Sequence, residues 1–268
     1  MSVFLVPSEI PASEYFRDVP KEKKFLYLNA GMSSLIVAWG FIFWDYGETG
    51  PHSSSENWFD EDSPNGGADK LGHFYTSYVF THVFSELYTS WGYERDRAIR
   101  LGALSSFMVQ GIMEVGDSYS RHGFAYDDLI LNALGSGIGY LTYRYPQISE
   151  KFDIRLQYFP SRKLFKEGSL DVFTDYDGMK YLVAAKLEGF EFVKNEYLKY
   201  IEFHLGYFTR GYGDNTGTYT SESRNMYVGI GLNLSRIFEK KSYHRLSKFL
   251  NYYQVPYTYV PLEYNMND

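Results

Sequence analysis

The chain has 268 residues, which suffices for one large domain or two modest ones. It carries 26 basic and 33 acidic residues, a formal net charge of −7, and no basic cluster, which argues against nucleic acid as a partner. It contains no cysteine, so disulfides and thiolate metal sites are excluded. The aromatic content is 19%, and tyrosine-rich, acidic sequences without cysteine and with short alternating strands are frequent among cell-envelope proteins, whose amphipathic rings lie between water and apolar surroundings.

The first 24 residues predict an extended arm. Pro7, Pro11 and Pro20 would interrupt any helix there. The short apolar run near the start has no basic flank, so we do not expect it to act as a signal peptide.

Residues 25–44 form a run of 20 uncharged residues, long enough to cross a bilayer. The run also includes Asn29, Ser33, Ser34 and two glycines, and the mean hydropathy of the whole chain is −0.34. We therefore expect a helix over about 24–45 that is buried or interfacial.

Three further helices are expected after a long loop rich in Gly, Ser, Pro and acidic residues. Apolar periodicity places them at about 69–91, 94–116 and 127–143. Pro146 ends the last of them.

After residue 150 the pattern changes to alternation. The runs YIEFHLGYF and MYVGIGLNLSRIF each place apolar side chains on one face, and KYLVAAKLEGF and DIRLQYFP are weaker candidates. Turn-rich spacers separate them, which predicts an antiparallel meander of four to six strands. His204 lies on a polar strand face, where we expect it to be solvated. The tail is expected to form a short basic helix and an extended end.

Together these patterns predict an α+β protein. Its expected parts are an extended arm at 1–24, a helical domain of about four helices at 25–148, and an antiparallel β-rich domain at 149–268 with a C-terminal helix and tail. The sheet could pack on the helices, lie against a membrane, or belong to a barrel that is closed from elsewhere. We expect the first arrangement.

The helices carry polar residues in pairs four positions apart. The pairs are Asp69 with His73, Gln110 with Glu114, and Asp128 with Asn132. This spacing places both members on one helix face. Because burying such groups among apolar side chains costs free energy unless they meet partners, we expect the helices to direct the pairs at one another.

Three kinds of site fit this cluster. A hard or borderline divalent cation is one, with carboxylates and one imidazole as ligands: Asp69, His73, Glu114 and Asp128. Acid–base catalysis is the second, for which Asp117 joins these four residues as a candidate. The third is a buried network that fixes the helix register, with further members Lys70, Gln110, Asn132 and Arg121.

The motifs ADKLGHFY, MEVGDSYS and GFAYDDLILNALGSGIG carry a family resemblance. They resemble those of the YfiM-like predicted periplasmic lipoproteins, especially the longer Bacteroidetes-type members with a β-rich C-terminal half. A more distant similarity is to VanZ-like membrane proteins, although the helices here are more polar. The chain lacks the lipobox cysteine, so lipid anchoring is not expected for this form. The resemblance implies a location in the cell envelope and a recurrent polar helical site, and it implies no reaction.

We therefore expect a bacterial cell-envelope protein, periplasmic or outer-membrane-associated, with a structural or ligand-binding role. One alternative is a metal-assisted hydrolase of an envelope lipid or glycan, with Asp117 or Glu114 as the base. Another is a subunit of a larger envelope assembly. The expected partners are the membrane surface or envelope proteins.

Overall fold

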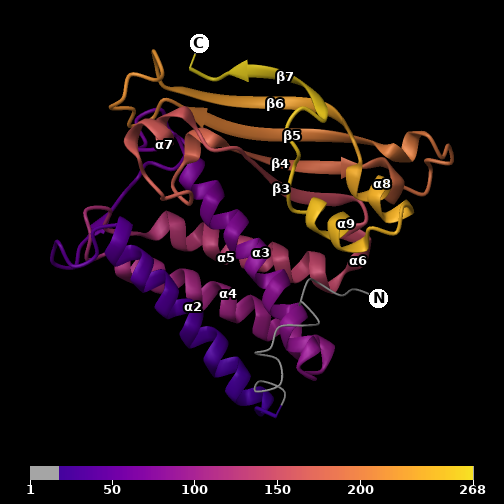
Figure 1. Ribbon diagram of the computed structural model, residues 1–268, viewed down its shortest axis with the longest axis horizontal. Coiled ribbons are helices and arrows are strands. Elements are labelled where there is room, and N and C mark those ends of the chain that lie inside the picture. Colours follow the sequence, from indigo (N-terminus) through magenta and orange to yellow (C-terminus); the bar gives the residue numbers. More distant parts are fainter. Residues whose placement is uncertain (1–17, 268) are drawn as a thin grey trace. The chain divides into compact units, whose positions relative to one another are not determined.

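The computed structural model describes residues 18–267, so the expected arm lies largely outside the described residues. The described chain divides into two compact units. The helical unit contains the residues up to Ser55 and Thr76–Arg144, and the sheet unit contains Glu56–Tyr75 and the residues from Tyr145 onward. Helices in the N-terminal part are followed by an antiparallel sheet, which confirms the α+β class (Figure 1).

The long helices lie within three residues of their predicted limits. They are α2 (Lys21–Phe43), α3 (Ala68–Ser90), α4 (Arg95–Asp117) and α5 (Tyr126–Arg144). Helix α3 is continuous: it begins in the sheet unit and passes into the helical unit at Thr76. Two short parallel strands, β1 (Ser53–Ser54) and β2 (Phe124–Ala125), join the loops before α3 and α5.

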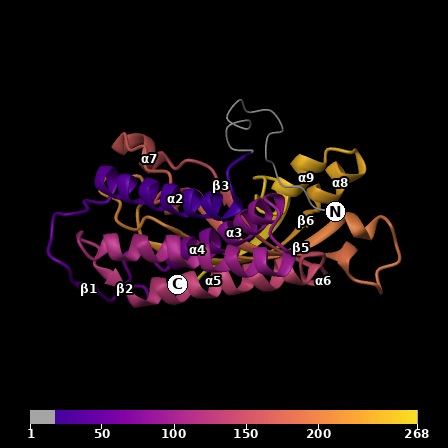
Figure 2. The same ribbon diagram turned by 90° about the horizontal axis from the view of Figure 1, so that it is seen from below.

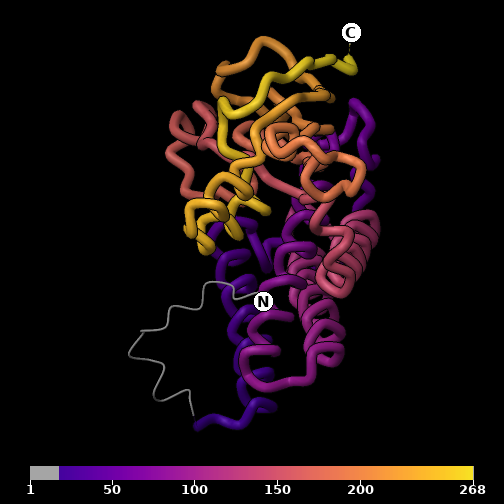
Figure 3. The backbone as a smooth tube through the Cα atoms, turned by 90° about the vertical axis from the view of Figure 1, so that its right-hand side faces the viewer, coloured from indigo at the N-terminus to yellow at the C-terminus, as the bar shows by residue number. Residues whose placement is uncertain are grey.

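Three hydrogen bonds made by side chains fix the register of α3 and α5. They join Ser77 to Asn132, His82 to Gly139, and Glu86 to Tyr143. Because the partner numbers rise together on both helices, α3 and α5 run parallel here. Figure 3 shows the helices of the helical unit alongside one another.

Glycine permits the close approach of these helices. A Cβ atom at Gly102 of α4 would lie 2.2 Å from Ser85 Oγ, and one at Gly139 of α5 would lie 2.8 Å from Thr81 Cβ. Both distances are shorter than real Cβ contacts, so the backbones approach only because these side chains are absent.

The interior of the helical unit contains many polar side chains beside its apolar core. Aromatic side chains around Phe84 and Tyr88 form an apolar core cluster, yet many other buried side chains are polar: Ser77, Thr81, Ser105, Ser106, Gln110, Asn132, Ser136 and Thr142. Helix α2 was expected to be either buried or interfacial. It contains a single buried residue, Gly40, so it is not a buried helix.

Among the described residues, five strands form an antiparallel meander in sequence order (Figure 1). They are β3 (Phe152–Tyr158), β4 (Met179–Lys186), β5 (Ile201–Arg210), β6 (Ser223–Leu232) and β7 (Tyr259–Asn265). The short helices of this unit are α6 (Pro146–Ser149), α7 (Arg162–Glu167), α8 (Leu234–Lys240) and α9 (His244–Leu250).

Two details of the C-terminal part differ from the prediction. Alternation had suggested that β6 continues beyond Leu232, but Asn233 Oδ1 accepts a hydrogen bond from Arg236 N at 3.0 Å and starts α8 instead. The extended end is a strand: β7 pairs with β6 along its length. Its partner was not evident from local sequence.

The two faces of the sheet differ sharply in chemistry. Cross-strand pairing aligns Ile154, Val183, Leu205, Val228 and Leu262 in one apolar row. The last four of these side chains are between 42% and 74% exposed.

The opposite face buries a charged network. Arg155 pairs with Glu202 and Asp153 at 2.7 Å each, and Lys186 pairs with Asp153 at 2.7 Å. His204 Nε2 lies 2.8 Å from Glu202 Oε1 and the residue is buried, so the expectation of a solvated His204 was wrong. In this sheet the polar face is the covered one.

Burial acts to raise the pKa of Glu202, but the hydrogen bond with His204 and the charge of Arg155 outweigh it, so the pKa lies below its usual value. Glu202 therefore stabilises the folded state above the ordinary carboxyl pKa, and this contribution is lost as the pH falls through the lowered value.

We predict opposite effects for two alanine substitutions in α4. Gly102→Ala should destabilise by about 1–3 kcal/mol because its Cβ meets Ser85. Gly111→Ala should stabilise by about 0.5–1 kcal/mol because its Cβ meets nothing within 4 Å and alanine favours helix. Thermal unfolding followed by circular dichroism measures both. Equal effects of the two substitutions would contradict the close packing at Gly102.

We also predict that Arg155→Met costs about 3–5 kcal/mol of unfolding free energy, since it leaves buried carboxylates without their guanidinium. Adding Glu202→Leu should recover much of that loss. Lys180→Met removes an ion pair to the more exposed Glu263 in the same sheet and should cost less than about 1 kcal/mol. Denaturant titration of the three variants tests this ranking.

Candidate functional site

Asn132 is the centre of a buried polar network in the helical unit. Its Oδ1 accepts from Ser77 Oγ at 3.0 Å and from Gln110 Nε2 at 3.5 Å. Its Nδ2 donates to Glu114 Oε1 at 3.1 Å. Asn132 is fully buried, and Gln110 and Glu114 are also buried. Side chains from α3, α4 and α5 thus meet at one amide, as the spacing of the pairs predicted for these members.

Four acidic residues of this unit lie where α4 ends and α5 begins. Glu114 and Asp117 lie in the last turn of α4, and Asp127 and Asp128 lie in the first turn of α5. Asp128 is buried and lies one helical turn before Asn132. Carboxylates in the first turn of a helix are favoured by its dipole.

Arg121 is not a member of the buried network. Its side chain is 71% exposed and donates to Glu48 Oε2 from Nη2 at 2.8 Å and from Nε at 2.9 Å. The loop after α4 carries Arg121 to the surface, where its charge is solvated at little cost. Sequence proximity to Asp117 had suggested the opposite.

The other predicted residues lie at the start of α3, in the sheet unit. Lys70 is fully buried and its Nζ donates to Glu56 and, at 3.0 Å, to Asp69 Oδ2. His73 follows Asp69 by one turn of the same helix. A buried ammonium between two carboxylates satisfies the requirement that buried charges be paired.

Glu56 was missed by the sequence reading. It lies in an acid-rich loop, 14 residues before Lys70, and no helical spacing links the two. Burial, together with a hydrogen bond and charge repulsion from Asp69, raises the pKa of Glu56 to about 8, although Lys70 acts against this. The two carboxylates therefore share a proton near neutral pH, which leaves a single negative charge opposite Lys70.

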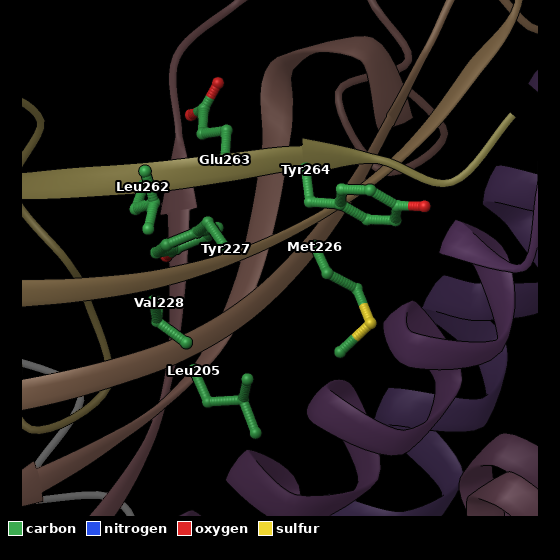
Figure 4. Close-up of a pocket in the computed structure, with 7 residues that line it drawn as sticks. All are labelled: Leu205, Met226, Tyr227, Val228, Leu262, Glu263 and Tyr264. Carbon is green, nitrogen blue, oxygen red and sulfur yellow. The ribbon is translucent and has the colours of Figure 1, made fainter. Parts of the chain in front are cut away.

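A separate pocket lies on the apolar face of the sheet. It encloses about 190 Å³ between β5, β6 and β7, and its lining is shown in Figure 4. The lining residues are Leu205, Met226, Tyr227, Val228, Leu262, Glu263 and Tyr264. Because Glu263 is its one carboxylate and no imidazole lines it, this pocket does not contain the predicted site.

Part of the chain is similar to a known family. Residues 55–144 match the family model "Predicted periplasmic lipoprotein (DUF2279)". The match covers about a third of the chain and includes the buried polar residues of α3, α4 and α5. This similarity indicates a protein of the cell envelope. No curated protein and no solved structure matches the chain.

The raised pKa of Glu56 predicts a pH effect on stability. Between pH 4.5 and about 8, Glu56 keeps its proton in the folded state but has lost it in the unfolded state. The free energy of unfolding should therefore fall as the pH rises through this range. Glu56→Gln, which cannot ionise, should reduce this loss. Melting temperatures at pH 5.5 and 8.5 test the effect. Glu61→Gln, an exposed carboxylate in the same loop, should retain the wild-type dependence.

Proposed function

We propose that this cell-envelope protein binds a divalent cation through Asp69, His73, Glu114 and Asp128. The observation that supports it best is the network at Asn132, in which buried polar groups of three helices meet. The proposal extends this polar layer by one helical turn, toward the acidic start of α5. The role is ligand binding, either to hold the fold together or to present the cation.

The register of α3 and α5 supports the extension. Ser77 bonds to Asn132, and His82 bonds to Gly139 farther along the same two parallel helices. Helix α3 continues without a break back to Ala68. One turn earlier on each helix, the same register would pair His73 with Asp128.

The chemistry of the donors supports a cation rather than an anion. Three carboxylates and one imidazole are ligands of divalent ions such as Mn²⁺ and Zn²⁺. Near neutral pH the shared proton of Glu56 and Asp69 can leave when a cation arrives, so binding should release protons and strengthen as the pH rises. Lys70 already pairs with Glu56 and Asp69, and its ammonium would neutralise negative charge of these two carboxylates that remains after the cation binds.

We predict that the purified chain of residues 1–268 binds Mn²⁺ or Zn²⁺ at one ion per chain. His73→Ala and Asp128→Asn should each weaken binding by at least about tenfold, since each removes a ligand. Isothermal titration and metal analysis by mass spectrometry measure this.

His82→Ala is the matched control for the loss of an imidazole from α3. His82 is buried and bonded to Gly139 and Thr142, so its loss should lower stability and leave the affinity for the cation unchanged. A wild-type chain that binds neither ion, or a His73→Ala variant with unchanged affinity, would refute the proposal.

A further inference from the structure

We infer that the outer faces of α2, α4 and α5 lie in the acyl-chain region of a lipid bilayer. The inference specifies the partner of an envelope protein and does not depend on the proposed cation. It rests on three features of the helical unit: the apolar side chains it exposes, the absence of charge between its ends, and the opposite charge of those ends.

An apolar belt surrounds the outer faces of these helices. Its large side chains are each between 41% and 68% exposed: Leu26, Leu35, Phe41 and Ile42 of α2, Leu104 and Met108 of α4, and Ile130, Leu134 and Leu141 of α5. On the surface of a water-soluble helix, these outward positions would carry charged residues. Figure 2 shows α2, α4 and α5 running alongside one another.

The belt coincides with uncharged stretches of sequence. No Asp, Glu, Lys or Arg occurs in residues 25–44, 101–113 or 129–143. The polar residues of the last two stretches, such as Ser106, Gln110 and Asn132, are buried inside the unit. Of the described helices, α2 alone is apolar enough in average composition to cross a membrane. The averages of α4 and α5 include the charged residues at the ends of both helices as well as buried polar side chains such as Gln110 and Asn132.

Charges collect at the two ends of the belt. One end is basic on balance: Lys21, Lys23, Lys24, Arg95, Arg97, Arg100 and Arg144 outnumber the acidic Glu22, Glu94 and Asp96. Contacts between helices bring these residues together: Lys21 Nζ donates to Gly92 O at 3.2 Å, and Arg144 pairs with Asp96. The other end carries the carboxylates of Asp45, Glu48, Glu114, Asp117, Asp127 and Asp128, and Glu48 is bonded there to Arg121.

This distribution favours lipid over a protein partner. A protein interface is a patch with a polar rim, whereas the belt extends over three helices and is interrupted by no charge. A helix of 23 residues, such as α2 or α4, is about 34 Å long, which suits a hydrocarbon layer of about 30 Å. Clustered basic residues at one end are typical of the side of a membrane helix that is not translocated.

Fluorescence quenching by lipid tests the inference directly. The chain has no cysteine, so single-cysteine variants need no background substitution. Leu35→Cys, Met108→Cys and Leu134→Cys would each be labelled with a bimane dye and reconstituted as the full chain in phosphatidylcholine–phosphatidylglycerol vesicles. Leu170→Cys is the matched control, because Leu170 is an apolar side chain that is 75% exposed but lies outside the belt.

We expect lipids brominated on their acyl chains to quench the three belt labels at least about twofold more than the Leu170 label. Aqueous iodide should show the reverse order. Equal iodide access at all four positions would overturn the inference. Disulfide crosslinking between two chains through the unlabelled belt cysteines, together with no quenching of the labelled belt positions by lipid, would also overturn it, because a second copy would then cover the belt. His73→Ala, which tests the cation site, should leave the quenching pattern unchanged.

Discussion

The helical unit depends on how one buried amide is satisfied. Asn132 accepts from Ser77 and Gln110 and donates to Glu114, so three helices contribute to one set of hydrogen bonds. A polar group buried without partners costs several times what a hydrogen bond gains, so helix registers that break this set are disfavoured. The close approach at Gly102 allows the same packing sterically. The acidic positions on α4 and α5 follow from this register.

Both units place polar groups inside and apolar groups outside. In the sheet unit, Arg155 and Glu202 are buried while Leu205 and Val228 on the other face are about half exposed. In the helical unit, Gln110 is buried while Leu134 is exposed. Soluble proteins also expose apolar atoms, but large contiguous apolar faces mark contact with something other than water. The buried charges are tolerated because each finds an opposite charge or a hydrogen bond.

Local patterns predicted a large part of the fold. Apolar periodicity gave the four long helices, and alternation gave β5 and most of β6, because these signals depend on neighbours in sequence. The pair spacing likewise predicted that Gln110, Glu114 and Asn132 would share a network. Features that depend on distant partners were missed, as β7 shows: its strand character follows from pairing with β6, which lies about 30 residues earlier. The ion pair between Glu56 and Lys70 could not be predicted from local sequence patterns either.

The sequence by itself determined which faces of the helices and strands would be polar, since side-chain direction follows from helical and strand periodicity. It did not determine which of those faces would be covered. Only the tertiary structure decided that His204 is buried, that Arg121 is exposed, and that the apolar sides of α2 and β6 remain uncovered. The physical reason is that burial depends on what packs against a face, and hydrophobicity alone does not specify whether that neighbour is protein, water or lipid.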